Sequence, residues 1–112
     1  MQAIVSDMPG MYRVEDLVRL ASREGAEEVR LQTGRSPVIL LRGEAHPLEL
    51  AILTSDEVAE LFRSFASADQ VEELHRCGDV RFNHTFQSSS RFGVTASLVG
   101  PDIMLTLKNL GR

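Results

Sequence analysis

The chain has 112 residues, of which 43% are hydrophobic and 25% charged, with one Cys and no Trp. This length and composition are typical of one globular domain, and they exclude wholesale disorder, a disulfide framework and a Cys-rich zinc module. The net charge of -4 argues against a generic nucleic-acid binder, which usually carries a basic face. The sequence shows a free thiol, no export signal and no apolar run near the ~20 residues that span a bilayer. It therefore favours a cytoplasmic protein without membrane insertion.

The first segment predicts a lead-in followed by a helix. We expect residues 1–12 to form a flexible lead-in and residues 13–112 to form the single domain. Apolar residues at helical spacing predict a helix from Val14 to Glu24, and Gly25 stands where the left-handed residue that ends a helix is expected.

Three strands are predicted next. Alternation predicts a half-buried strand from Glu28 to Gln32, and the continuous aliphatic run Val38 to Leu41 is typical of a central strand in a covered sheet. The tripeptide Arg42-Gly43-Glu44 predicts a tight hairpin turn into a third strand around Ala45 to Leu50. Pro47 places that third strand at an edge, because proline cannot donate a hydrogen bond to a neighbouring strand.

Two helices follow in the middle of the chain. Thr54-Ser55-Asp56-Glu57 is a capping box, in which side chains satisfy the first backbone N–H groups of a helix. Ser67-Ala68-Asp69-Gln70 repeats the box for a shorter helix that ends at Gly78. The first of these helices has an apolar stripe made of Val58, Leu61, Phe62 and Phe65.

The last third predicts three further strands. Apolar residues alternate over Val80 to Phe86 and over Phe92 to Leu98, with a polar turn at Ser88-Ser89-Ser90 between them. Gly100-Pro101-Asp102 then turns the chain into a strand from Ile103 to Leu110. The order αβββααβββ predicts an α+β domain with an antiparallel sheet of about six strands covered by three helices.

The sequence does not support a catalytic or metal-binding constellation. His75, Cys77 and His84 have metal-ligand chemistry but lack the paired spacing of zinc sites, so we predict a helix-end His, a small core Cys and an inward-facing strand His. The eight Gly form no phosphate-binding loop, and Lys108, the single Lys, follows no such loop. We therefore predict no catalytic residues, no metal and no cofactor.

The order of motifs resembles the N-terminal domain of the PilT-type twitching-motility ATPases, which are relatives of the type II secretion ATPases. The resemblance covers roughly Val14 to Leu110. The similar segments, in chain order, are Gly25 to Leu31, Gly34 to Pro37, Arg42 to Leu48, Leu53 to Val58, Val80 to Phe86 and Arg91 to Thr95.

The resemblance implies a PAS-like domain that packs against the ATPase core of a neighbouring subunit in a hexameric ring. It also implies strand arginines that reach a nucleotide held between subunits. In this chain Arg91 retains one such position and Lys108 stands in place of the family's last strand Arg. Gly93 and Thr95 replace an Arg and an Asn of the family motif, and a Lys is only a point-charge substitute for a guanidinium.

We therefore expect a non-catalytic protein-interaction domain that docks on a pilus or secretion ATPase or on its regulator. The docking surface is expected on the exposed side of the sheet and its turns, around Arg35, Arg42, Arg91 and Lys108. The chain alternatively forms an excised part of a complete hexameric ATPase, and homo-oligomerisation stays open.

A third interpretation is a PAS-like small-molecule sensor. Pockets of this kind are mostly apolar with a few polar anchors. The pocket would lie between helices and sheet, lined by Phe62, Phe65, Phe82, His84 and Phe86.

Overall fold

The computed structural model describes residues 13–86 and 90–111; the expected lead-in over residues 1–12 and Ser88 and Ser89 of the expected serine turn lie outside this range. The helices and strands follow the predicted order. They are α1 (Val14–Glu24), β1 (Glu28–Gln32), β2 (Val38–Leu41), β3 (Glu44–Pro47), α2 (Ser55–Arg63), α3 (Ala68–Cys77), β4 (Asp79–Thr85), β5 (Arg91–Val99) and β6 (Asp102–Gly111).

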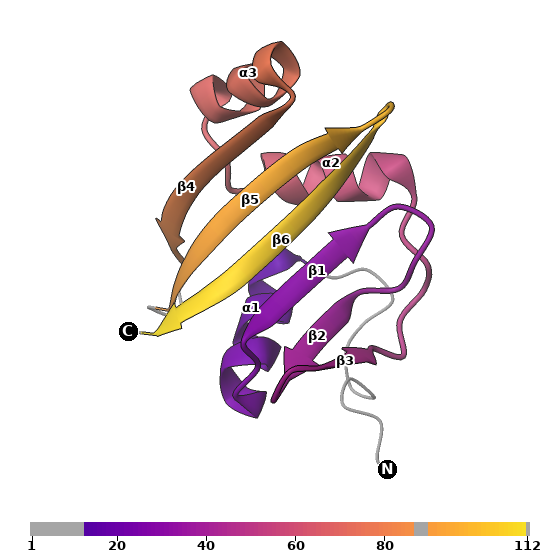
Figure 1. Ribbon diagram of the computed structural model, residues 1–112, viewed down its shortest axis with the longest axis vertical. Helices are drawn as coiled ribbons and strands as arrows, with labels where there is room; N and C mark the ends of the chain where they lie inside the picture. The colour runs from indigo at the N-terminus through magenta and orange to yellow at the C-terminus, as the bar shows by residue number, and fades with distance from the viewer. Residues whose placement is uncertain (1–12, 87–89, 112) are drawn as a thin grey trace.

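The strands form one open antiparallel sheet in the order β3-β2-β1-β6-β5-β4 (Figure 1). Two three-stranded meanders meet where β1 pairs with β6, with Val29 opposite Leu107 and Leu31 opposite Leu105. The predicted α+β architecture of three helices and six antiparallel strands is confirmed. The sheet does not close on itself, so β3 and β4 are its two edges.

The helices begin and end at the capping residues that the sequence predicts. Thr54 Oγ1 accepts a hydrogen bond from Glu57 N at 3.2 Å, and Glu57 Oε1 accepts one from Thr54 N at 2.8 Å. Ser67 and Gln70 make the same pair of bonds at the start of α3. Gly25 ends α1 with φ 73°, in the left-handed region that costs glycine little. Each of these elements is therefore bounded by its own local sequence.

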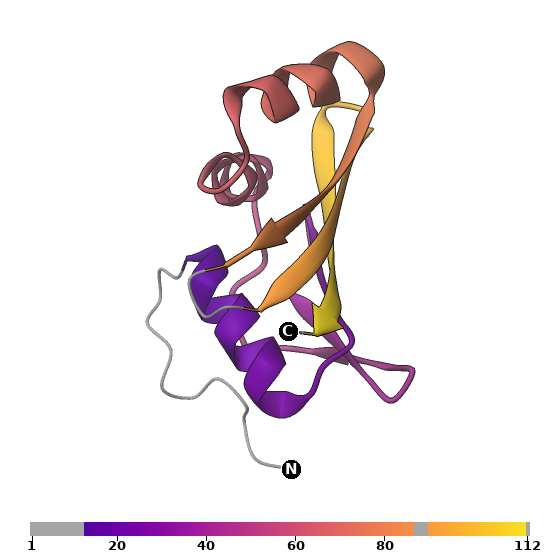
Figure 2. The same ribbon diagram turned by 90° about the vertical axis from the view of Figure 1, so that its left-hand side faces the viewer.

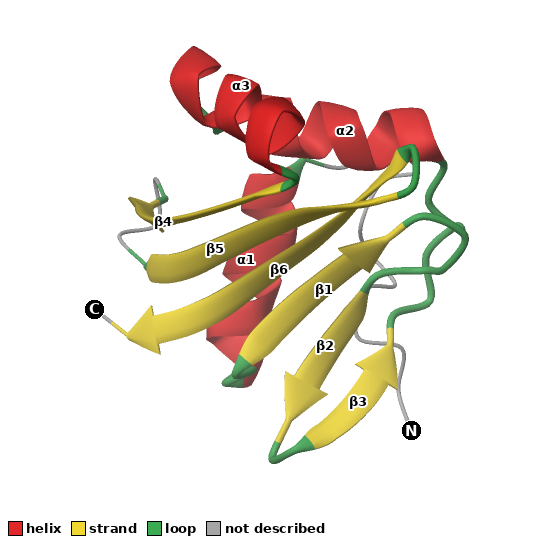
Figure 3. Ribbon diagram, turned by 45° about the horizontal axis from the view of Figure 1, so that its top comes forward, coloured by secondary structure: helices red, strands yellow, loops and turns green. Residues whose placement is uncertain are grey.

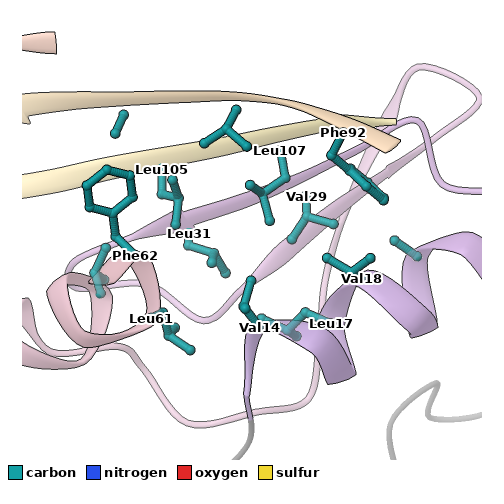
Figure 4. Packing of buried hydrophobic residues seen from close by; sticks show 14 of the residues in the cluster. Val14, Leu17, Val18, Val29, Leu31, Leu61, Phe62, Phe92, Leu105 and Leu107 are labelled. Carbon is teal, nitrogen blue, oxygen red and sulfur yellow. The ribbon is translucent and has the colours of Figure 1, made fainter. Parts of the chain in front are cut away.

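The hydrophobic core lies between the helices and one face of the sheet (Figure 2). Figure 4 shows Leu17 and Val18 of α1 and Phe62 of α2 facing the alternate residues of the central strands. Those alternate residues are fully buried, and they include Val29, Leu31, Val94, Leu105 and Leu107. This side of the sheet carries the packing that holds the domain together.

The structure corrects two expectations about the first three strands. β2 is the second strand from the edge, and Ile39 is its one fully buried residue, because the helices cover a single face of the sheet. Leu40 is half-buried on the other face, opposite Glu28. The expected strand over Ala45 to Leu50 ends at Pro47, although its predicted place at the edge is confirmed.

The turns keep the strands in register. Arg42 and Gly43 form the two-residue connection between β2 and β3, with φ of 53° and 81°. Positive φ at both positions is the geometry of a type I′ turn, whose twist matches that of the flanking strands.

Among the described residues no helix is long and apolar enough to cross a bilayer.

Candidate docking face

Figure 3 shows the side of the sheet turned away from the helices, here called the open face. Most of the residues on this face are polar. Side chains alternate between the two faces along each strand, so the residues next to the buried ones define it. They are Glu28, Arg30 and Gln32 of β1, Val38 and Leu40 of β2, Ala45 and Pro47 of β3, Asp79, Arg81, Asn83 and Thr85 of β4, Arg91, Gly93, Thr95, Ser97 and Val99 of β5, and Asp102, Met104, Thr106, Lys108 and Leu110 of β6.

One row of this face places two arginines on either side of two threonines. Arg81 lies opposite Thr95, Thr95 opposite Thr106, and Thr106 opposite Arg30. Directly opposed residues on one face have Cβ atoms about 4.5–5.5 Å apart, so the four side chains form a continuous band across four strands. Both arginines are exposed, and Arg30 Nε is ion-paired with the Glu28 carboxylate on its own strand. The band can therefore present guanidinium and hydroxyl donors to an anionic partner surface.

The neighbouring row contains Lys108, which lies between Glu28 of β1 and Gly93 of β5. A Cβ atom added at Gly93 would lie 3.7 Å from both Asn83 Oδ1 and Leu110 Cδ1, which is ordinary contact distance. The side chains of Asn83 and Leu110 therefore lie over Gly93, opposite the exposed Lys108 of β6. Beside it a shallow hollow of about 650 Å³ extends to the junction between α1 and β1.

The four cations expected around one docking surface separate into two groups. Lys108 lies level with Glu28, and the neighbouring Glu27 Oε1 accepts a hydrogen bond from Gly43 N at 3.1 Å, which brings the Arg42-Gly43 turn to the same end of the sheet.

Arg91 also lies at this end, opposite Gly111. Arg35 lies in the turn at the other end of β1, where its N–H donates to Gln32 O and its carbonyl accepts from Leu53 N. The structure therefore brings Arg42, Arg91 and Lys108 to one end of the sheet and places Arg35 at the opposite end.

Arg30 and Arg81 were not among the expected docking residues. Arg30 lies between the buried Val29 and Leu31, and Arg81 lies between the buried Val80 and the half-buried Phe82. That alternation shows that they leave the core. It does not show that they share one row, because the pairing of β1 with β6 joins segments about 75 positions apart.

The residues with metal-ligand chemistry are not brought together. His75 and Cys77 are exposed at the end of α3, so the expectation that Cys77 is a core residue is wrong. Cys77 is the last residue of α3 and only Leu74 of that helix is fully buried, so the thiol lies beyond the packed surface. In the described ranges no three His, Cys, Asp or Glu side chains form a group that could hold a metal ion.

The five residues of the expected pocket do lie together, as a cluster of rings in edge-on and tilted contact. Phe65 lies 5.9 Å from Phe62, 6.1 Å from Phe82 and 5.3 Å from His84, measured between ring centroids. His84 also meets Phe86 at 4.6 Å, in an edge-on arrangement. Phe62 and Phe86 are buried, whereas Phe65, Phe82 and His84 are half-buried. Ring-to-ring contact of this kind is ordinary aromatic packing, and a bound small molecule stays a prediction.

Comparison with known proteins identifies the fold and not the sequence family. No protein-family profile and no curated protein matches the amino-acid sequence. Solved structures do match: the domain has the fold of a part of the pilus retraction motor PilT and of the ATPase DotB.

The pilus retraction motor PilT, solved with bound ADP, superposes with a TM-score of 0.83 at 20% identity over 91% of this chain. The ATPase DotB superposes with a TM-score of 0.77 at 20% identity for the Legionella pneumophila protein, and of 0.67 at 14% identity for the Yersinia pseudotuberculosis protein.

The match confirms, at the level of fold, the resemblance noted from the sequence motifs. The chain spans only about 30% of the length of the PilT and DotB chains that it matches. The fold alone is shared at this level of identity, and function has to be argued from the residues of this chain.

Proposed function

We propose that this domain is a non-catalytic docking module that lays its open face against an ATPase core of the pilus or secretion type, or against a regulator of such a core. The observation that carries the proposal is the face of a six-stranded sheet that residues 13–86 and 90–111 leave uncovered, with Arg30, Arg81 and Lys108 exposed on it. The likeness to part of PilT and DotB supports the choice of partner.

The chemistry of the open face favours an anionic partner surface. Guanidinium groups bind carboxylates or phosphates through paired hydrogen bonds, and an ammonium group adds a point charge. Arg42 and Arg91 extend the cationic region along the end of the sheet that holds Lys108. Since the whole chain carries a net charge of -4, this concentration of cations on one face would orient the domain toward its partner.

The proposal assigns no reaction to the domain and places it in the cytoplasm. The sequence has no phosphate-binding loop of its own, so nucleotide chemistry would belong to the partner core. The domain would contribute contacts that depend on the position of the core, which is how a rigid module reports or restrains motion in a neighbour.

The test compares two charge-reversal pairs with the same change in net charge. Arg30→Glu with Arg81→Glu alters the open face, whereas Arg19→Glu with Arg63→Glu alters exposed helical positions. Binding of each variant to a purified PilT-type ATPase core from the same organism is measured by calorimetry.

We expect the open-face pair to weaken binding by more than about tenfold, which corresponds to roughly 1.4 kcal/mol, and the helical pair to bind as the parent does. Equal affinities of the two pairs would contradict the proposal.

A second comparison separates the two ends of the sheet. Arg91→Glu should weaken binding, and Arg35→Glu should leave it close to the parent value, because Arg35 lies at the far end from Lys108. A rise in salt should weaken the parent complex and have less effect on the Arg91 variant. If only the Arg35 variant loses affinity, the docking surface lies at the other end of the domain.

The domain would keep this role within a larger protein. Its coverage of about 30% of the PilT and DotB chains fits one domain of a complete ATPase, in which the partner core would follow in the same chain or belong to a neighbouring subunit. Reading the frame beyond the codon for Arg112 tests this: a phosphate-binding loop there would make the proposed partner a covalent neighbour.

A further inference from the structure

The two edges of the sheet differ in how they are protected. β3 has four residues and includes Pro47, which has no N–H group to offer to an added strand. β4 has seven residues, contains no proline, and lies at the opposite margin of the sheet (Figure 1). Natural sheets usually blunt such an edge, because unpaired backbone groups invite another strand. β4 is therefore the edge that can pair with an additional strand.

The backbone groups that β4 presents at this margin can be assigned from its pairing with β5. Leu98 N donates to Gly78 O at 2.9 Å at one end, and Phe86 N donates to Ser90 O at 3.0 Å at the other. Hydrogen-bonded pairs alternate along an antiparallel ladder, so the even-numbered residues of β4 bond to β5.

The odd-numbered residues of β4 direct their N–H and C=O groups outward instead. They are Asp79, Arg81, Asn83 and Thr85, and all four are exposed. In the described part of the chain no backbone hydrogen bond reaches this outer side of β4.

We propose that β4 pairs antiparallel with β4 of a second copy of this chain, about a two-fold axis through Phe82. In this register Asp79 lies opposite Thr85 of the second copy, and Arg81 lies opposite Asn83 of the second copy. Four outward N–H groups in each copy then meet four outward C=O groups in the other. Every free group on both edges is satisfied, through eight backbone hydrogen bonds.

Other registers fit the edge less well. An axis through Arg81 would place two guanidinium groups directly opposite one another, which destabilises a strand pair. An axis through Asn83 would leave Asp79 of each copy beyond the facing strand. A shift by a single residue would oppose outward groups to groups already bonded within the sheet. The self-complementary register through Phe82 is the one that uses the whole edge.

The side chains of β4 that face the helices also favour a second copy of this chain as the partner strand. Phe82 and His84 point to that side and are half-buried, together with Phe65. Phe82 would face its own copy across the axis, in a non-hydrogen-bonded pair where side chains approach most closely. Pairing would cover these half-exposed rings. It would also continue the sheet from one copy to the next, so that the two open faces lie on the same side.

The first experiment measures the mass of the chain by sedimentation equilibrium from micromolar to millimolar concentration. We expect a reversible dimer. Asn83→Pro should raise its dissociation constant by more than about tenfold, because proline removes an outward N–H and leaves the bonds to β5 intact. Asn83→Ala is the matched control and should dimerise like the parent. Circular dichroism shows whether each variant is folded, and Arg81→Pro replaces any variant that is not.

The second experiment traps the register in a Cys77→Ser background. Phe82→Cys should form a disulfide between copies, since non-hydrogen-bonded partners bring Cα atoms to about 4.5 Å. Thr85→Cys should not, because the two Thr85 residues would lie on opposite sides of the axis. A chain that stays monomeric at millimolar concentration, a dimer unaffected by both proline variants, or equal cross-linking at the two positions would each overturn the proposal.

Discussion

The hydroxyl oxygens of Ser22 and Ser90 lie 2.8 Å apart and join the last turn of α1 to the residue just before β5, across 68 positions of sequence. Ser90 is 8% exposed and is the one polar residue among the described positions that is buried. A buried hydroxyl loses its hydration, so this contact replaces water with a partner inside the fold. It attaches α1 to the sheet beside the last turn of the helix.

Removing this contact should lower stability by a modest amount. Ser90→Ala leaves the Ser22 hydroxyl without its partner, and we expect the free energy of unfolding to fall by about 1 kcal/mol in urea denaturation. Ser22→Ala should have a similar effect. The double variant should cost less than the sum of the two single changes, and strict additivity would show that the two hydroxyls do not interact.

Thr33 differs from Ser22 and Ser90, because removing its hydroxyl should stabilise the protein. Its Oγ1 is buried and has no hydrogen-bond partner in the described part of the chain. Thr33→Val keeps the shape of the side chain and replaces the hydroxyl by a methyl group, so it should raise the free energy of unfolding by roughly 1 kcal/mol. Thr33→Ser keeps the hydroxyl and removes the methyl group, and it should be no more stable than the parent. A destabilised Thr33→Val protein would mean that the hydroxyl has a partner.

Two glycines should respond in opposite directions to the same substitution. Gly93 does not have positive φ, and a Cβ atom there meets its neighbours at ordinary distances, so Gly93→Ala should stabilise the strand by roughly 0.5–1 kcal/mol. Gly25 has φ 73°, and Gly25→Ala should destabilise by about 1 kcal/mol because alanine is strained in that conformation. Thermal unfolding of both variants checks the pair, and the same sign for both would contradict the backbone argument.

Asn109 ties the end of β6 to the junction of α1 and β1. Its Nδ2 donates to Ala26 O at 3.2 Å, and its Oδ1 accepts from Gly111 N at 2.8 Å. In Asn109→Ala the Gly111 N–H loses its partner and should exchange with solvent much faster. The N–H of residue 109 should stay protected, since that bond, to Glu27 O at 2.8 Å, is made by the backbone. Hydrogen exchange followed by NMR reads both sites, and unchanged exchange at Gly111 would refute the role of the side chain.

Local signals in the sequence predicted most of the fold. The capping boxes at Thr54 and Ser67 define helix starts through contacts three residues apart, and Gly25 and Gly78 end helices through their own φ values. Such features depend on neighbours in the chain, so they can be recognised without knowing the tertiary structure. Alternation likewise predicted β1, β4 and β5 and which of their residues face the core.

The docking face was less predictable, because it depends on which strands become neighbours. The row from Arg81 to Arg30 exists only because β1 pairs with β6, and no local pattern specifies that pairing. For the same reason the sequence alone does not separate Arg35 from Arg42, Arg91 and Lys108, which lie at the opposite end of the sheet. The prediction of a buried Cys77 was wrong for a different reason. Cysteine is usually buried, but Cys77 is the last residue of α3, a helix in which only Leu74 is fully buried.

The one-sided covering of the sheet separates the positions that specify folding from those that do not. Arg30, Arg81, Thr95 and Thr106 lie in a row, yet none of them belongs to the buried cluster that holds the helices to the strands. A combinatorial library varied at these four positions should therefore yield mostly folded proteins with many different surfaces. The domain can serve as a display scaffold on which new binding specificities are selected while its core stays constant.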